Sequence, residues 1–303
     1  MKLEIRTPAK INLGLKILGK RDDGYHELET LFQMVDFYDR LEIESIPAGI
    51  RLECDTAGIP VDNSNLVWRA VEALKEGRKE VSGVSIRLTK KIPSGAGLGG
   101  GSGNAAGTLL ALNKLWDLQL TRPQLQKIAA TLGSDIPFFL ESPCALGQGR
   151  GERLTALQGA EKFDVLLVSP HFPISTAEVY GQLKWGLTNT GNDISILRKF
   201  LSKSDIQGLA GCLFNDLEPG VVERHSQIQE IKDALTGMGA CGALLSGSGS
   251  TVFGVFSDSE KAEKALMGFP RGDWDLKLCK TVKSFADFIP DEILSYTDSI
   301  LLK

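Results

Sequence analysis

A run of glycines is the first feature of this sequence that could bind a ligand. Six of the nine residues in Gly95–Gly103 are glycine, and the run lies between a strand-like segment and an apolar, helix-like one. Backbone N–H groups at the start of a helix attract anions, and glycine lets phosphate oxygens approach the backbone. The run therefore predicts a phosphate-binding loop. The whole candidate segment is Pro93, Ser94, Gly95, Ala96, Gly97, Leu98, Gly99, Gly100, Gly101, Ser102 and Gly103.

Two well-known nucleotide-binding loops fit this run poorly. A Walker A loop ends in Gly-Lys-Ser/Thr, but no lysine accompanies Ser102, so that motif is excluded. The dinucleotide fingerprint is matched from Gly95 to Gly100, but it also requires an acid at the end of the next strand, ~20 residues on. Asp117 has that spacing but ends the predicted helix Asn104–Leu118. A flexible surface loop needs no such density of glycine, so we favour phosphate binding.

Asp135 is a candidate for proton transfer. It stands between Gly133, which ends a predicted helix, and the apolar run Ile136–Leu140. One interpretation is an ordinary acid in the first turn of a helix capped by Ser134, where the helix dipole favours it. The other is a general base, because a carboxylate beside an apolar run is costly to explain by solvation alone.

Lys10 begins a stretch that alternates like a β-strand. From Lys10 to Lys16 the even-numbered residues are polar or glycine, and from Ile11 to Ile17 the odd-numbered residues are apolar. The polar face sets an ammonium beside the amide of Asn12. Lysines mostly lie on surfaces, so the pattern fits either a surface lysine or a cation that stabilises phosphate charge.

Tyr25 and His26 follow the turn signal Arg21–Gly24. From the residues alone, they are a packed aromatic ring and an exposed imidazole. The chain has only three histidines, the other two being His171 and His225, and no pair has metal-ligand spacing. A zinc site is therefore not expected, and no residue is assigned as a metal ligand.

The elements that would position these residues divide the chain in two. Residues 1–157 are expected to hold strands, a helix after Asn63 and Ser64, a strand that leads into the glycine run, and two further helices. Residues 158–283 follow the order strand, helix, strand, strand, helix, strand, with additional helices, which is typical of a ferredoxin-like unit. Residues 284–303 form a tail with the pattern of an amphipathic helix and no assigned role.

Composition narrows the class of protein. A length of 303 residues suits two domains, and 42% hydrophobic residues exclude intrinsic disorder. The net charge is 34 − 38 = −4, with no basic block, so we expect no nucleic acid or membrane partner. Five scattered cysteines indicate a reducing compartment. A long charge-free stretch, Thr236–Ser257, is rich in glycine and serine rather than apolar, so a cytoplasmic protein is expected.

Three segments together resemble the signatures of the GHMP small-molecule kinases. They are Pro8–Leu13, Pro93–Ala106 and Leu245–Gly254, in that order along the chain. Two more, Gly24–Leu28 and Gly133–Phe139, are similar to one branch of that family, the kinases of 4-diphosphocytidyl-2-C-methyl-D-erythritol in the non-mevalonate isoprenoid pathway. The resemblance extends from residue 1 to about residue 283.

This resemblance implies an α+β fold with an N-terminal domain like ribosomal protein S5 domain 2 and a C-terminal ferredoxin-like domain. It implies phosphorylation of the acceptor's 2-hydroxyl with ATP as co-substrate and Mg²⁺ beside it. The partners would be small-molecule substrates, and the chain would act as a monomer or homodimer. Two alternatives stay open: a GHMP kinase for another alcohol, such as homoserine or mevalonate, and a catalytically silent nucleotide-binding sensor.

The resemblance also implies roles for individual residues. Asp135 would be the catalytic base and Lys10 its cationic neighbour, while Pro93–Gly103 would hold the ATP phosphates. Gly103 stands where the family usually has serine, so a side-chain phosphate contact is not expected there. Adenine would meet Asn65 and Leu66, which equally fit a helix cap and a core leucine. The acceptor would meet Asn12, Tyr25, His26, Thr176, Tyr180, Gly247, Ser248 and Gly249, with Tyr25 and Tyr180 on either side of the cytosine, although Tyr180 also fits a helix core.

Overall fold

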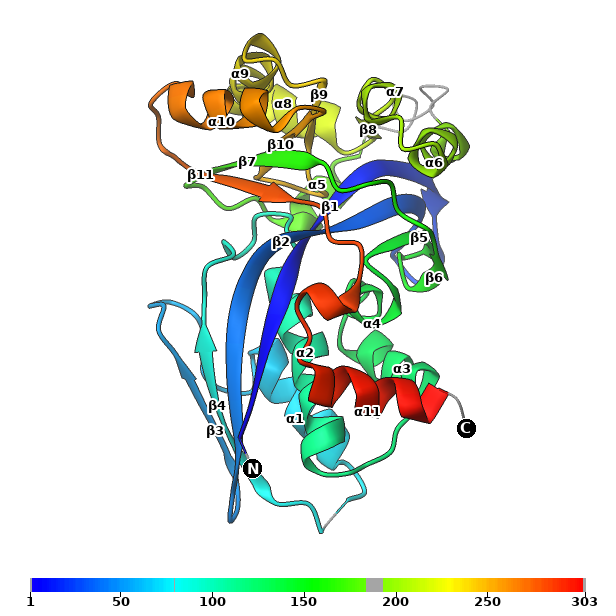
Figure 1. The fold of residues 1–303 in the computed structure, drawn as a ribbon, viewed down its shortest axis with the longest axis vertical. Helices are drawn as coiled ribbons and strands as arrows, with labels where there is room; N and C mark the ends of the chain where they lie inside the picture. The colour runs from blue at the N-terminus through cyan, green and yellow to red at the C-terminus, as the bar shows by residue number, and fades with distance from the viewer. Residues whose placement is uncertain (1, 79, 184–192, 302–303) are drawn as a thin grey trace.

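The computed structural model describes residues 2–78, 80–183 and 193–301. Residue 1 of the expected first domain and residues 302–303 of the expected tail lie outside them. Two β-sheets with helices packed on them form an α+β architecture, as the sequence predicted (Figure 1).

The strands are β1 (Lys2–Lys20), β2 (His26–Ile46), β3 (Ile50–Cys54), β4 (Gly83–Thr89), β5 (Cys144–Gly149), β6 (Arg153–Ala156), β7 (Asp164–Pro170), β8 (Phe214–Asn215), β9 (Gly242–Leu245), β10 (Val252–Phe256) and β11 (Trp274–Lys280). The α-helices are α1 (Leu66–Lys75), α2 (Gly100–Leu115), α3 (Arg122–Leu132), α4 (Phe138–Glu141), α5 (Thr176–Gly181), α6 (Ile194–Ser202), α7 (Ile206–Ala210), α8 (Glu218–Arg224), α9 (Ser226–Gly237), α10 (Ser259–Gly268) and α11 (Asp291–Leu301), with the short 3₁₀ helix η1 (Phe285–Asp287) before the last.

The first sheet is built on one long antiparallel pair, β1 and β2. Its strands follow the order β3-β4-β2-β1-β8, with β5 on the other part of β2 and β6 beside β5. The register of β1 against β2 shifts at three places, between Pro8 and Ala9, between Asn12 and Gly14, and between Ile17 and Gly19. Such bulges bend a strand and increase its twist. The bend lets the β1–β2 pair belong to both parts of the sheet: β2 pairs with β4 along one part of its length and with β5 along the other.

Helices α1 to α4 pack on one face of this sheet and form its core. The apolar stripe predicted for α1 is buried, at Val67, Ala70, Val71 and Leu74, and Asn65 caps the helix. The tail adds to the same core, because Phe288 and Ile289 are nearly buried and Ile293 is fully buried there. In Figure 1, α11 lies beside α2 and α3 on that side of the sheet.

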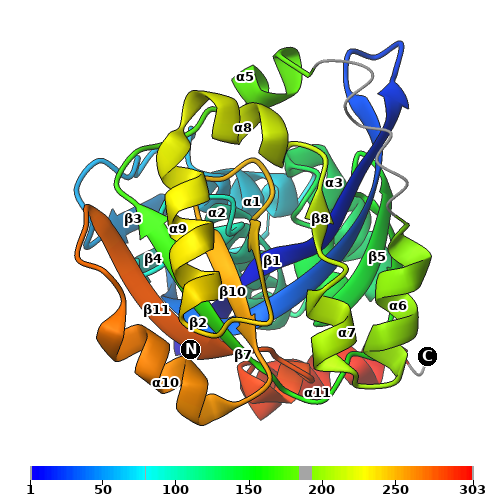
Figure 2. The same cartoon turned by 90° about the horizontal axis from the view of Figure 1, so that it is seen from above.

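The second sheet has the strand order β11-β7-β10-β9, and all its neighbours are antiparallel. Numbered by their order along the chain, β7, β9, β10 and β11 are strands 1, 2, 3 and 4 of this sheet. Their order across the sheet is therefore 4-1-3-2. This is the ferredoxin-like arrangement predicted for the second half of the chain. Figure 2 shows α9 over β10 and α10 beside β11, with α8 next to α9.

The expected division near residue 157 falls in the connection between β6 and β7, where the chain passes from one sheet to the other. Two later segments return to the first sheet. Strand β8 pairs with β1 in parallel, at Gly14 and Leu15, and the tail joins the core under α2.

Three expected elements differ in the structure. The helix predicted over Asn104–Leu118 begins at Gly100, inside the glycine run, because Gly99 takes the left-handed conformation and starts the helix there. Asp135 lies in a turn ahead of α4 rather than in the first turn of a helix. The tail is two helical pieces, η1 and α11, because Pro290 interrupts the predicted continuous helix.

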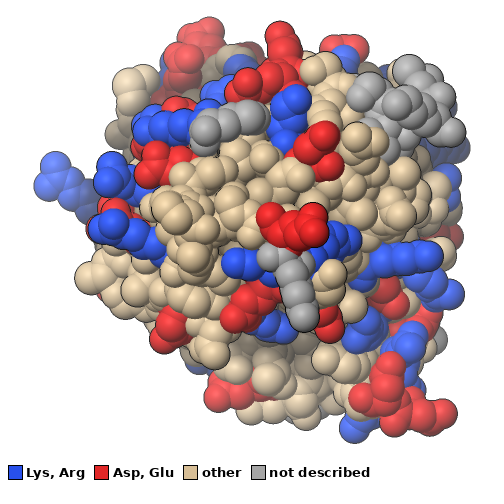
Figure 3. All heavy atoms as spheres, turned by 90° about the horizontal axis from the view of Figure 1, so that it is seen from below, with Lys and Arg blue, Asp and Glu red and all other residues tan. Residues whose placement is uncertain are grey.

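Acidic and basic side chains of the described residues are interspersed on the face shown in Figure 3. Within residues 2–78, 80–183 and 193–301, no helix has both the length and the apolar character needed to cross a bilayer.

Candidate active site

One cavity of about 330 Å³ gathers most of the residues that the sequence singled out. Its wall is made by β1, β2, the glycine run, the turn before α4, α5 and the loop between β9 and β10. The predicted site residues in its wall are Lys10, Asn12, Leu66, Pro93, Ser94, Gly95, Ala96, Gly97, Gly99, Gly100, Gly101, Ser102, Asp135, Thr176, Tyr180, Gly247 and Ser248.

The glycine run is an anion cradle made of backbone. Gly95, Gly97 and Gly99 have φ values of 68°, 78° and 67°, a left-handed conformation that favours glycine. Helix α2 starts directly after Gly99, and no side chain caps it among the described residues. The N–H groups of its first turn are therefore available, together with the positive end of the helix dipole, to a phosphate in the cavity.

A second glycine-rich loop, residues 246–251, supports the first. A Cβ on Gly97 would lie 2.0 Å from the carbonyl oxygen of Ser246, so only glycine allows this approach. The hydroxyl of Ser246 donates a 3.0 Å hydrogen bond to the carbonyl of Gly97, and the amide of Thr251 donates one of 3.1 Å to that of Ala96. The two loops thus hold each other in place.

Lys10 and Asp135 meet in the cavity, as the resemblance implied. The ammonium of Lys10 is 3.5 Å from Oδ2 of Asp135, and the lysine side chain is 5% exposed against 36% for the aspartate. The lysine is buried by the protein, whereas the carboxylate remains accessible to a ligand. This ion pair lies next to the glycine run, because the Lys10 side chain passes close to Gly99.

A buried chain of hydrogen bonds fixes the position of the Lys10 ammonium. Lys10 donates to Oδ1 of Asn12 at 2.7 Å, and Nδ2 of Asn12 donates to the hydroxyl of Thr30 at 2.8 Å. That hydroxyl donates to the carbonyl of Gly14 at 2.7 Å. The amide orientation of Asn12 is therefore set, and the lysine has one preferred position.

The aromatic ring of Tyr180, which lines the cavity, packs beside the ring of His26, which lies outside the cavity wall. The rings of His26 and Tyr180 lie 5.3 Å apart, and the hydroxyls of Thr176 and Ser248 are 2.8 Å apart. Burial, with a smaller contribution from the charge of Asp135, raises the pKa of the Tyr180 phenol well above its usual range. Burial and the charge of Lys20 lower the pKa of the His26 imidazole. At neutral pH the two rings are therefore an uncharged phenol, which lines the cavity, and an uncharged imidazole beside it.

Six predicted residues lie outside the cavity wall. Asn65 uses its side chain to cap α1 and to bind the carbonyl of Pro60, at 2.9 and 2.6 Å. A Cβ on Gly103 would face the Pro8 carbonyl and Phe139 instead of the cavity, so a serine there would point into the protein. Tyr25 is 53% exposed at the surface. The remaining three are Leu98, His26 and Gly249.

Five residues of the wall were not predicted. Leu28, Thr30 and Phe32 alternate along β2, and that period-two pattern was a usable signal. Leu15 belongs to the apolar face of the predicted strand, but the bulge between Asn12 and Gly14 turns it to the cavity. The fifth is Arg150, in the turn between β5 and β6, which carries no sequence pattern.

A buried ion pair lies beneath the start of α2. Asp39, which is fully buried, pairs with the ammonium of Lys90 and accepts hydrogen bonds from the amides of Lys91 and Ile92 at 2.7 and 2.9 Å. Nδ2 of Asn104, on α2, donates to the other carboxylate oxygen at 2.9 Å. Asp39 therefore ties β2 to both ends of the glycine run.

Among the described residues, no three His, Cys, Asp or Glu side chains are arranged to hold a metal ion by themselves. The oxygens of Ser102 and Asp135 do share the cavity wall. Hard oxygen donors of this kind suit Mg²⁺, which commonly uses one or two protein ligands together with substrate phosphates.

Comparison with known proteins connects this site to a family. The model of the GHMP kinases N terminal domain matches residues 65–142, and that of the GHMP kinases C terminal region matches residues 197–270. The chain is 47% identical over 274 residues to the 4-diphosphocytidyl-2-C-methyl-D-erythritol kinase of Syntrophus aciditrophicus, which covers 90% of this chain and 96% of that protein.

Two solved structures extend the likeness to the fold. A crystal structure of 4-(cytidine 5'-diphospho)-2C-methyl-D-erythritol kinase has a TM-score of 0.80 and 32% identity, covering 92% of this chain and 99% of the other. Homoserine kinase from Cytophaga hutchinsonii has a TM-score of 0.76, over 93% and 95% of the two chains, but only 20% identity, so it shares the fold alone.

Proposed function

The chain belongs to the GHMP kinases, and we propose that it transfers the γ-phosphoryl group of ATP to the 2-hydroxyl of 4-diphosphocytidyl-2-C-methyl-D-erythritol. The products are the 2-phosphate of the acceptor and ADP, and the reaction serves the non-mevalonate route to isoprenoid precursors. The observation that carries the proposal is the ion pair of Lys10 and Asp135 beside a backbone cradle for phosphate.

We assign a part of the reaction to each of these groups. The N–H groups of the glycine run and of the first turn of α2 hold the donor phosphates. Asp135 accepts the proton of the acceptor hydroxyl as that oxygen attacks the γ-phosphorus, and the bond from phosphorus to the ADP oxygen breaks. Lys10, held by Asn12, stabilises the negative charge on the phosphoryl group in transit.

Mg²⁺ accompanies ATP in this proposal, and the hydroxyl of Ser102 in the cavity wall is the protein oxygen that would hold it, together with the phosphates of ATP. When bound, it neutralises charge on the phosphate oxygens.

The remaining contacts position the two substrates. Tyr25 and Tyr180 are assigned to the faces of the cytosine and His26 to its edge, supported by the 5.3 Å approach of the His26 and Tyr180 rings. Leu66 is assigned to the adenine pocket, since it lines the cavity next to Gly101. Asn65 belongs to the same pocket only through its cap on α1, which sets where Leu66 begins the helix.

We also propose a domain organisation, a cellular location and a class of partners for the chain. The chain forms two domains, residues 1–157 and 158–283, with both substrates in the cleft between them. It works in the cytoplasm on small molecules, as a monomer or homodimer, without a nucleic acid or membrane partner.

The test measures ADP formation from ATP, Mg²⁺ and the cytidyl acceptor, with homoserine and mevalonate as alternative acceptors. Asp135→Asn and Lys10→Met are expected to lower kcat by ~10²–10⁴-fold, because each removes a group that acts in the transition state, while both substrates still bind. Asp233→Asn is the matched control, since that carboxylate is exposed and accepts a hydrogen bond from Gln229 on α9. Near wild-type turnover by Asp135→Asn would refute the mechanism, and preference for homoserine or mevalonate would refute the acceptor.

A further inference from the structure

Arg150 lies in the turn of the β5–β6 hairpin, at the edge of the cavity. The hairpin is anchored to the site because Gly149 pairs with Leu28 on β2, and Leu28 itself lines the cavity. Arg150 also lines it, although nothing in the mechanism above uses its charge.

The turn holds Arg150 in a defined position. Its backbone amide donates a 2.6 Å hydrogen bond to Glu152, and its Nε lies 3.8 Å from the other oxygen of the same carboxylate. Gly149 and Gly151, on either side, have φ values of 75° and 104°, which permit the tight turn. Glu152 thus fixes the backbone at Arg150 and places its negative charge near the base of the guanidinium.

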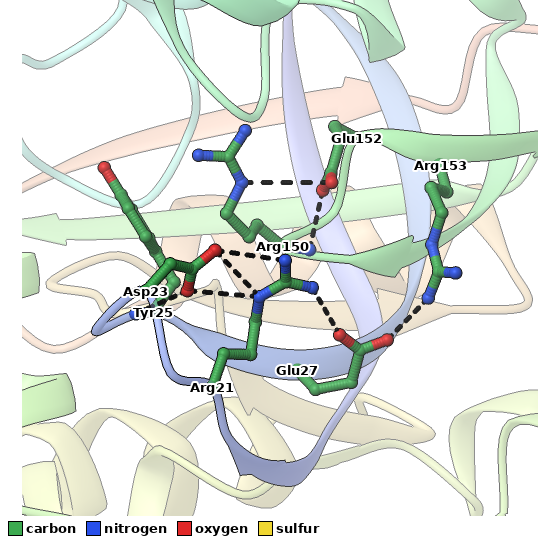
Figure 4. A network of polar contacts seen from close by, with 7 residues as sticks. All are labelled: Arg21, Asp23, Tyr25, Glu27, Arg150, Glu152 and Arg153. Carbon is green, nitrogen blue, oxygen red and sulfur yellow. Dashed lines mark hydrogen bonds and ion pairs between the residues drawn. The ribbon is translucent and has the colours of Figure 1, made fainter.

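The outer end of the guanidinium remains available to a ligand. Among residues 2–78, 80–183 and 193–301, its two terminal nitrogens have no hydrogen-bond or ion-pair partner (Figure 4). The guanidinium carbon lies 4.8 Å from the centre of the Tyr25 ring. Stacking on an aromatic ring occupies the flat face of arginine and leaves the in-plane N–H donors free, so Tyr25 does not compete with an anion.

Charge in the cavity wall leaves one cation unassigned. The charged residues of the wall are Lys10, Asp135 and Arg150. Lys10 is engaged with Asp135 and Asn12, so Arg150 is the cation of the wall with free donors. It stands beside Tyr25, at the end of the site where the proposed acceptor places its base, and a diphosphate joins the cytidine that carries this base to the alcohol.

We propose that Arg150 binds the diphosphate of the acceptor through its terminal nitrogens while it stacks on Tyr25. The proposal rests on the proposed function and adds to it a specificity-determining residue. A planar guanidinium fork matches two phosphate oxygens, and such charge-assisted pairs are about twice as strong as neutral hydrogen bonds. Arg150 therefore favours an acceptor that carries a diphosphate over a neutral small alcohol.

The experiment compares the binding of CDP with that of cytidine, measured by calorimetry on the full chain. In Arg150→Gln, the Kd for CDP is expected to rise by ~10–100-fold, while that for cytidine, which has no phosphate, stays the same. Arg150→Lys keeps the positive charge but not the planar fork, so its Kd for CDP is expected to lie between those of the wild-type chain and Arg150→Gln. In turnover assays the KM for the acceptor rises and the KM for ATP does not.

Two variants separate a phosphate contact from mere support of Tyr25. Tyr25→Ala is expected to weaken CDP and cytidine together, because both contain the base. Arg153→Gln, on the same hairpin, is the control and should change neither, since Arg153 is exposed and pairs with Glu27 away from the cavity wall.

The outcomes also separate this inference from the proposed function. If Arg150→Gln weakens CDP and cytidine equally, or neither, Arg150 does not bind the diphosphate and the inference is wrong while the function stands. A different result would overturn both. If the acceptor site of the wild-type chain, as distinct from its ATP site, binds CDP no better than ADP, the proposed acceptor is wrong, and the inference is wrong with it.

Discussion

Removing the charge of Asp39 should destabilise the protein and loosen the phosphate cradle. This carboxylate is fully buried and accepts hydrogen bonds from Lys91, Ile92 and Asn104 besides its ion pair with Lys90, whose side chain is 6% exposed. In Asp39→Asn the ammonium of Lys90 stays buried without a counter-charge. Breaking one partner of a buried pair typically costs about 3–5 kcal/mol, a large share of a total stability of about 5–15 kcal/mol.

A second substitution makes the reasoning specific. Lys90→Met removes the stranded charge, so the double variant Asp39→Asn/Lys90→Met should recover at least ~1.5 kcal/mol relative to Asp39→Asn alone. Urea unfolding followed by circular dichroism and by tryptophan fluorescence gives these free energies where the two transitions coincide. The KM for ATP should rise in Asp39→Asn, because Lys90 lies against Gly100 at the start of α2.

The control is an exposed ion pair of the same chemistry. Glu260→Gln on α10 breaks the surface contact with Lys264 and should change the free energy of unfolding by no more than about 0.5 kcal/mol. The reasoning fails if Asp39→Asn costs less than about 1 kcal/mol, or if adding Lys90→Met destabilises the chain further.

Two more predictions concern the glycine loops and pH. Gly97→Ala should raise the KM for ATP at least ~10-fold, since alanine is strained at φ 78° and its Cβ would drive the two glycine-rich loops apart. Gly237→Ala, at a position with open space, is the control and should leave the KM for ATP unchanged. Equal KM values for the two variants would contradict the contact between the loops. Asp273, and then Asp275, raise the pKa of His171 above its usual 6.5, so the charged imidazole stabilises the fold below pH 6.5 and this contribution is lost as pH rises through the folded-state value. An NMR titration should place the His171 pKa above 6.5 and show a fall in Asp273→Asn; an unchanged value would show that the carboxylate has no effect.

Much of the site could be predicted because its chemistry is local in sequence. The glycine run predicts a phosphate-binding loop without any tertiary information. The alternation around Lys10 places its ammonium beside the amide of Asn12. The meeting of Lys10 with Asp135 came from the family resemblance, since no spacing rule brings together residues so far apart in the chain.

The features that escaped prediction depend on contacts between distant segments. Asp39 and Lys90 are 51 positions apart, and each alone looks like an ordinary surface charge. Leu15 changes sides only because a bulge interrupts the register of β1 with β2. Arg150 faces the cavity because its hairpin is paired with β2, and a turn residue carries no periodicity that reveals this.

The start of α2 shows a different limit. Glycine has a poor helix propensity, which favours placing the helix after the glycine run, at Asn104. The structure begins it at Gly100, where the left-handed Gly99 and packing against β1 outweigh that propensity. Four residues that look like loop thus become the first turn of the phosphate-binding helix.

The tail has a consequence for how the chain is made. Phe288, Ile289 and Ile293 cover the core beneath α2, yet a ribosome adds them after every residue of the four-stranded sheet. At a synthesis rate of ~5–20 residues per second, the interval from residue 158 to residue 293 lasts on the order of 10 s. During that time the apolar surface under α2 is uncovered on the nascent chain, and a chaperone that recognises such surface has its opportunity before the polypeptide is released.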